Sequence, residues 1–129
     1  MKFELNPHYD NLRADLTELG TKWQNIMDLG HFTINHVFRE IIKEDEPDTL
    51  ADTKAFWQYR QARIAWYLPT LSQFGKPEVE NAMVHELTHV LLAPVEDGVK
   101  GGKENLVELS AENVTRALIA AVRYREDNA

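Results

Sequence analysis

The sequence predicts an α+β fold in which helices pack on a small antiparallel sheet. Three features favour it: apolar residues at helical spacing before residue 43, a strand-like aromatic stretch over residues 54–71, and two further helical stretches after residue 76. A chain of 129 residues has the length of one globular domain. We therefore expect a single domain over residues 1–129, built around one hydrophobic core.

The N-terminal third is expected to form two helices and a loop. Leucines recur at three- and four-residue spacing over Asn11–Leu19, which predicts a first helix that ends at Gly20. A longer helix is expected over Lys22–Lys43, where the apolar residues fall on one broad face. The acidic run at residues 43–48 contains a proline among like charges, so we expect a solvated loop there.

Strands are expected next, followed by two helices. Partial alternation of apolar and polar residues over Lys54–Leu71 predicts one hairpin or two short strands. Pro77 is typical of a first helical turn, and the helix that it begins should run to about Leu92 and stop before Pro94. A glycine-containing loop then leads to the last helix, expected over Glu104–Tyr124.

The composition excludes several classes of protein. A net charge of −7 and an isoelectric point near 5.2 have the wrong sign for neutralising the phosphates of a nucleic acid. No apolar run approaches the roughly 18 residues of a membrane span, and no signal-peptide core follows Met1, so we expect a cytoplasmic protein without a membrane partner. The chain has no cysteine, which leaves histidine and carboxylate as its strong metal ligands.

One motif carries a strong chemical signal, the HExxH run of residues 85–89 on the helix that begins at Pro77. Residues four apart lie on the same helix face, so His85 and His89 can reach one metal ion while Glu86 contacts a water held on it. The flanks are apolar nearly all round, so the helix should be buried and its polar groups need a strong common partner. A metal ion supplies that partner. The alternative is two core histidines bonded to carbonyls and an ion-paired Glu86.

A catalytic zinc takes three protein ligands, and the third must be a carboxylate because no histidine follows His89. The last helix offers Glu104, Glu108 and Glu112, while Asp97 in the preceding loop is a weaker choice. Counting from the helix ends puts the level of the histidine pair between Glu108 and Glu112. Spacing therefore leaves these two open, together with the alternative that both are ordinary solvated carboxylates.

Residues 53–122 resemble the gluzincins, zinc metallopeptidases with HExxH on one helix and a ligating glutamate on the next, antiparallel helix. The narrower likeness is to small phage-type, minimal metallopeptidase domains. It rests on Val84–Leu92 and, more loosely, on Glu112–Leu118. The resemblance implies a minimal zincin-like fold with Glu86 as general base. It also implies a Zn2+ ion held by His85, His89 and preferably Glu112. Glu108 would then lie next to the ligands without binding the metal, or the roles of the two glutamates would be reversed.

The activity that the resemblance implies is zinc-dependent hydrolysis of peptide bonds in a peptide or protein substrate. Zinc would lower the pKa of its bound water, and Glu86 would take the proton and return it to the leaving amine. The alternative is a non-catalytic, zinc-stabilised binding or structural module of phage origin. Such a module needs the ligands but no general base, so the presence of Glu86 favours the enzyme.

Two further features of the cleft are expected. A side chain that stabilises the oxyanion is usually needed, and the candidates are Tyr59, Tyr67, Arg63 and His36. In zincins the substrate lies along the edge strand that precedes the HExxH helix. The resemblance therefore implies that the block of residues 53–76, with four basic and no acidic side chains, borders the cleft and favours acidic peptide segments.

Overall fold

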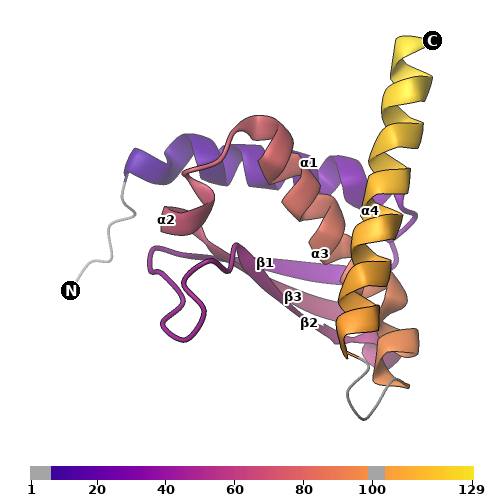
Figure 1. Cartoon of the computed structure of the whole chain (residues 1–129), viewed down its shortest axis with the longest axis horizontal. Coiled ribbons are helices and arrows are strands. Elements are labelled where there is room, and N and C mark those ends of the chain that lie inside the picture. Colours follow the sequence, from indigo (N-terminus) through magenta and orange to yellow (C-terminus); the bar gives the residue numbers. More distant parts are fainter. Residues whose placement is uncertain (1–6, 99–103) are drawn as a thin grey trace.

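Helices α1 and α3 cover one face of a three-stranded sheet, and α4 packs against α3 (Figure 1). The structure is a computed structural model, and it describes residues 7–98 and 104–129, so the expected loop at 99–103 lies outside the described residues. The α+β class is confirmed. The elements are η1 (Pro7–Tyr9), α1 (Asp10–Ile26), β1 (Thr33–Arg39), β2 (Ala51–Phe56), η2 (Trp57–Tyr59), β3 (Gln61–Tyr67), α2 (Leu68–Leu71), α3 (Lys76–Asp97) and α4 (Glu104–Asp127).

The N-terminal third differs from the sequence-based expectation. Gly20 does not end a helix but lies inside α1, where a side chain would crowd the sheet: an added Cβ would sit 3.1 Å from Nε2 of His36. The helix predicted over Lys22–Lys43 is wrong, because its first part belongs to α1 and its second part contains strand β1. The chain leaves α1 through Asp28, whose φ of 56° is incompatible with continued helix.

The sheet is mixed rather than antiparallel. Its strand order is β1-β3-β2, in which β2 pairs with β3 as the expected antiparallel hairpin while β1 runs parallel to β3. This order follows the path of the chain. After β1 at one edge of the sheet, the chain crosses to the opposite edge to form β2, and the hairpin then places β3 between β1 and β2. Along β2 and β3 successive side chains alternate between faces, so Thr53 and Ile64 face the helices while Lys54 and Arg63 point the other way.

Helix α3 is buried on most of its circumference, as its apolar flanks predict, and its buried residues include Glu86 and Thr88. The expectation that it stops before Pro94 is wrong, because the helix continues to Asp97. A proline inside a helix removes one backbone hydrogen bond. Two contacts hold the additional turn: Glu96 bonds to His89, and Asp97 accepts a hydrogen bond from the indole of Trp57.

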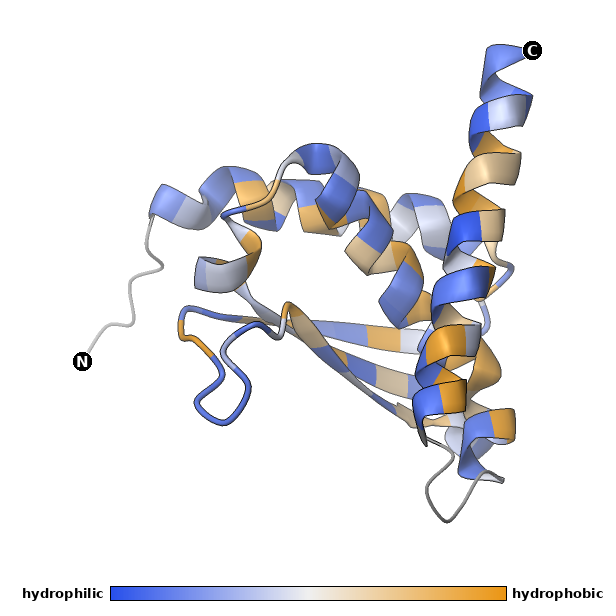
Figure 2. Cartoon of the chain, in the orientation of Figure 1, coloured by the Kyte–Doolittle hydropathy of each residue, from blue (hydrophilic) through white to orange (hydrophobic). Residues whose placement is uncertain are grey.

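Small residues let α4 lie close against α3. Ala111 and Thr115 are fully buried, and the hydroxyl of Thr115 lies 3.5 Å from that of Thr88. Figure 2 shows hydrophobic and hydrophilic residues alternating along α4, as expected for a helix with one packed face. Within the described residues, no helix combines the length and the hydropathy that crossing a membrane requires.

His36 is a titratable side chain placed on the covered face of the sheet. Its Nδ1 accepts a hydrogen bond of 3.0 Å from the indole N–H of Trp66, and the two rings stack. Burial lowers the pKa of His36, because the charged imidazolium would lose its hydration there. The fold therefore holds this histidine in its neutral form.

We expect acid to destabilise the fold through His36. The folded pKa of His36 lies below the unfolded value of about 6.5, so the folded state keeps its full stability above that pH. As the pH falls below it, the unfolded state binds the proton more readily and the free energy of unfolding decreases. Urea unfolding at pH 7.5 and pH 5.5 should show the wild type losing up to about 1.4 kcal/mol relative to His36→Gln. The glutamine can still accept the Trp66 hydrogen bond. An unchanged difference between the two proteins would contradict a buried, neutral His36.

Candidate metal centre

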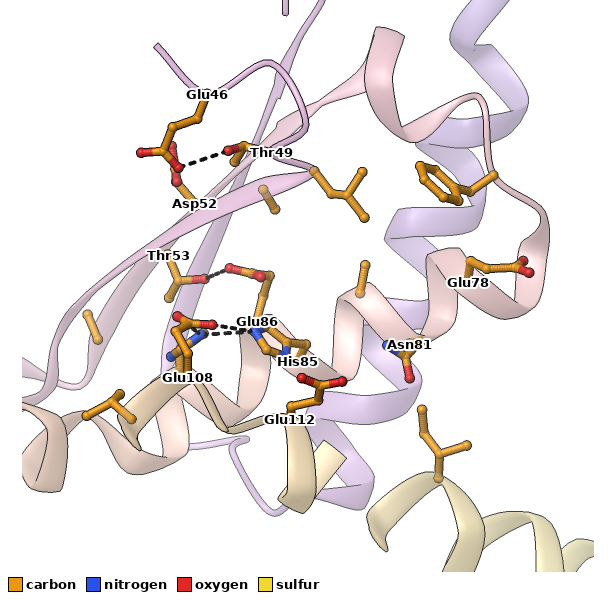
Figure 3. Close-up of a pocket in the computed structure, with 18 of the residues that line it drawn as sticks. Glu46, Thr49, Asp52, Thr53, Glu78, Asn81, His85, Glu86, Glu108 and Glu112 are labelled. Atoms are coloured by element: carbon orange, nitrogen blue, oxygen red, sulfur yellow. Dashed lines mark hydrogen bonds and ion pairs between the residues drawn. The ribbon is translucent and has the colours of Figure 1, made fainter. Parts of the chain in front are cut away.

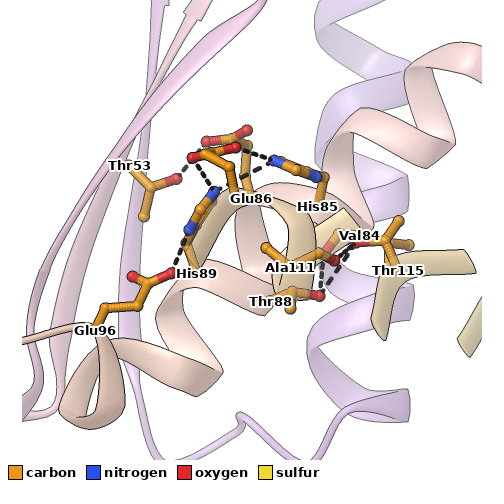
Figure 4. A network of polar contacts seen from close by, with 10 residues as sticks. Thr53, Val84, His85, Glu86, Thr88, His89, Glu96, Ala111 and Thr115 are labelled. Atoms are coloured by element: carbon orange, nitrogen blue, oxygen red, sulfur yellow. Dashed lines mark hydrogen bonds and ion pairs between the residues drawn. The ribbon is translucent and has the colours of Figure 1, made fainter. Parts of the chain in front are cut away.

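The two motif histidines converge, as the four-residue spacing predicts. Helix α3 presents both rings on the face that meets β2 and α4, with their Nε2 atoms 3.2 Å apart and the rings edge to face (Figure 4). Both side chains are mostly buried, at 23% exposure for His85 and 14% for His89. Two imidazole nitrogens therefore face the same point in space.

Glu108 of α4 completes a three-residue group. One of its carboxylate oxygens lies 3.3 Å from Nε2 of His85, and the other lies 3.2 Å from Nε2 of His89 (Figure 3). Ligand atoms of a tetrahedral zinc with bonds of 2.0–2.1 Å are about 3.3 Å from one another. The two ring nitrogens are separated by about this length, and each lies at a similar distance from a different oxygen of Glu108, so these three residues could hold a metal ion.

Glu112, the other candidate ligand, lines the same cavity but is not in this group. Its carboxylate is half exposed and accepts a hydrogen bond of 3.0 Å from Arg116. Glu108 and Glu112 are four residues apart and lie on nearly the same face of α4, so they differ chiefly in their position along the helix axis. Ala111 and Thr115 fix that position by packing against α3. Asp97, the weaker candidate, is bonded to Trp57 instead.

Glu86 is held beside the histidines without belonging to the group of His85, His89 and Glu108. Its side chain is 9% exposed, and its Oε1 accepts a hydrogen bond of 2.7 Å from the hydroxyl of Thr53 on β2 (Figures 3 and 4). Burial raises the pKa of Glu86 to about 7, although the Thr53 hydrogen bond partly opposes that effect. A carboxylate with a pKa close to neutrality is suited to accept and return a proton.

Glu96 is a site residue that sequence reasoning missed. Its Oε1 lies 2.6 Å from Nδ1 of His89, the ring nitrogen that faces away from His85 and Glu108. Burial by itself would lower the pKa of His89, but the hydrogen bond and charge of Glu96, together with the charges of Glu86 and Glu108, outweigh it, and the pKa is raised. The expected helix end before Pro94 concealed this contact, because it left Glu96 in a loop.

The site opens into a cavity of about 1050 Å³ between β2, α3 and α4. Its lining contains seven carboxylates and one arginine, Arg123, so the cavity is strongly acidic. None of the four basic residues at 53–76 lines it. Lys54 and Arg63 instead line a separate cavity of about 370 Å³, because strand alternation points them away from α3. The expected preference for acidic peptides therefore finds no support in the position of these cations.

The structure brings none of the expected oxyanion-stabilising residues into the large cavity. Tyr67 donates its hydroxyl hydrogen to Asp52 at 2.8 Å, and Tyr59 is 76% exposed on η2. Arg63 lines the smaller cavity, and His36 is bonded to Trp66. These four residues were selected by chemical type alone, without a spacing that tied them to the motif.

No family model, curated protein or solved structure matches the chain. The distinctive features of this site are two histidines and a glutamate whose side chains converge, with a buried glutamate beside them.

Removing the charge of Glu86 should stabilise the metal-free protein at alkaline pH. The folded pKa of about 7 lies above the ordinary value of 4.5, so the ionised side chain increasingly destabilises the fold as pH rises between these values. In chelator, Glu86→Gln should gain about 2 kcal/mol over the wild type between pH 5.5 and pH 8, measured by urea unfolding. Glu112→Gln, an equal charge change at a half-exposed site, is the matched control and should show no such gain.

Proposed function

We propose that this protein is a zinc-dependent metallopeptidase with a minimal zincin-like fold. The observation that carries the proposal is the convergence of His85, His89 and Glu108 beside a buried glutamate that is not in their group. A zinc ion bound there would polarise the scissile carbonyl and activate a water molecule. Two histidines and one carboxylate are a typical ligand set for zinc, whereas magnesium and calcium prefer oxygen-rich sites.

Glu86 has the position and the environment of a general base. Thr53 donates to its Oε1, which orients the carboxylate and leaves further lone pairs to accept a proton from a water in the cavity. The same carboxyl group could then return that proton to a leaving amine. A structural zinc site gains nothing from burying this carboxylate, which favours an enzyme over a zinc-stabilised binding module.

The cavity has room for a peptide substrate. Strand β2 forms one wall, and it is an edge strand, so its outer backbone groups are available to a chain in extended conformation. This places backbone hydrogen-bonding groups next to Thr53 and Glu86. A peptide or protein is therefore the proposed substrate, and the acidic lining disfavours nucleic acid there.

Metal content tests the ligand set. Protein purified without a histidine tag should contain about one zinc per chain by elemental mass spectrometry, and His85→Ala should lose it because only two ligands remain. Glu108→Gln should lose most of the zinc while Glu112→Gln retains it. Loss in Glu112→Gln with retention in Glu108→Gln would assign the third ligand to Glu112. Absence of zinc from the wild type, with none taken up at micromolar concentration, would reject the proposal.

Peptide hydrolysis tests the activity itself. The wild type, loaded with zinc, should cleave members of a mixed peptide library, detected as new termini by mass spectrometry. Glu86→Gln should retain zinc and lose about 10²–10⁴-fold in rate, the usual contribution of a general base. Glu112→Gln provides the control for a charge change at the same cavity. Equal rates for the wild type and Glu86→Gln would favour the non-catalytic module.

A further inference from the structure

The contact between Glu96 and His89 is the shortest that the structure gives to either motif histidine. It joins Oε1 of Glu96 to Nδ1 of His89 at 2.6 Å, within the range of charge-assisted hydrogen bonds. Both side chains are mostly shielded from water, with 14% exposure for His89 and 22% for Glu96. A contact of this length and burial restrains the orientation of the imidazole ring.

The contact exists because α3 continues beyond Pro94. Residues seven positions apart are nearly two helical turns apart and lie on the same face, so Glu96 comes under the His89 ring. A helix that ended at Leu92 would leave residue 96 without this geometry. The additional turn, held also by the Trp57 hydrogen bond to Asp97, thus supplies a carboxylate to the site from the motif's own helix.

Hydrogen-bond chemistry then fixes which nitrogen of the neutral ring carries the proton. An ionised carboxylate can only accept, so Nδ1 of His89 must donate to Glu96. In the neutral ring Nε2 is left with a lone pair, which faces Nε2 of His85 and an oxygen of Glu108, each at 3.2 Å. The lone pair and the carboxylate oxygen are both acceptors and repel each other, and a metal ion bound by all three groups would remove that repulsion. Glu96 therefore prepares Nε2 for a metal ion.

We propose that Glu96 is a positioning residue, which fixes the tautomer and the ring orientation of His89 so that Nε2 presents its lone pair to a divalent metal. This inference rests on the proposed function. It concerns His89 alone, since no contact to Nδ1 of His85 occurs among the described residues to give that ring a similar restraint.

Zinc affinity of the metal-free protein provides the first test, measured by competition with a chromophoric chelator at fixed pH. Glu96→Ala should bind zinc about 10- to 100-fold more weakly than the wild type, the usual effect of removing a carboxylate that orients a ligating histidine. Glu96→Gln should recover part of the loss, because its amide oxygen can still accept from Nδ1. Asp97→Ala is the control for a loosened helix end: it removes the other contact that holds the same turn but none that touches His89, so its affinity should fall by less than that of Glu96→Ala.

The tautomer of His89 provides a second readout that a general loosening of the helix end would not produce. Ring nitrogen chemical shifts of the metal-free protein, at a pH where His89 is neutral, should report a proton on Nδ1 in the wild type and in Asp97→Ala. In Glu96→Ala the proton should move largely to Nε2. Unchanged affinity and tautomer in Glu96→Ala would overturn the inference while leaving the proposed function intact. If the wild type binds no zinc, the proposed function fails, and the tautomer alone decides whether Glu96 positions His89.

Discussion

The central constraint on this structure is the burial of three ionisable side chains on little more than one turn of an apolar helix. Glu86, His85 and His89 lose hydration in α3, and each uncompensated polar group would cost several kcal/mol. Three elements supply partners: β2 provides Thr53, α4 provides Glu108, and the last turn of α3 provides Glu96. The positions of the edge strand and of the last helix therefore both depend on the chemistry of this one turn.

The part of the site that the sequence predicts is the part that is local. Positions 85, 86 and 89 are tied together by helical geometry, so their convergence needs no tertiary information. Glu108 and Glu112 lie one turn apart on nearly the same face of α4, so the choice between them depends on how α4 is placed along α3, where Ala111 and Thr115 pack. No sequence pattern identifies Ala111 and Thr115 as the residues that pack against α3, and the narrower resemblance favours Glu112.

The errors in the fold have equally specific causes. Ile34 and Phe38 are four residues apart, a spacing that fits one face of a helix and also one face of a strand, so periodicity alone could not distinguish β1 from a helix. Gly20 was interpreted as a helix end, although its use is to admit His36 beside α1. The parallel pairing of β1 with β3 is a contact between distant segments that no local pattern encodes.

The separation of charge across strand β2 gives the molecule an electric polarity. Seven carboxylates and one arginine line the larger cavity, whereas four basic residues and two carboxylates, one of them shared between the cavities, line the smaller one: Arg39, Lys43, Lys54, Arg63, Glu44 and Asp52. The resulting electric field attracts a diffusing cation toward the acidic cavity, so that the two meet more often than random collision would allow. Ionic strength weakens such steering, so the rate at which a cation reaches the cavity, unlike the positions of the side chains that line it, depends on the surrounding medium.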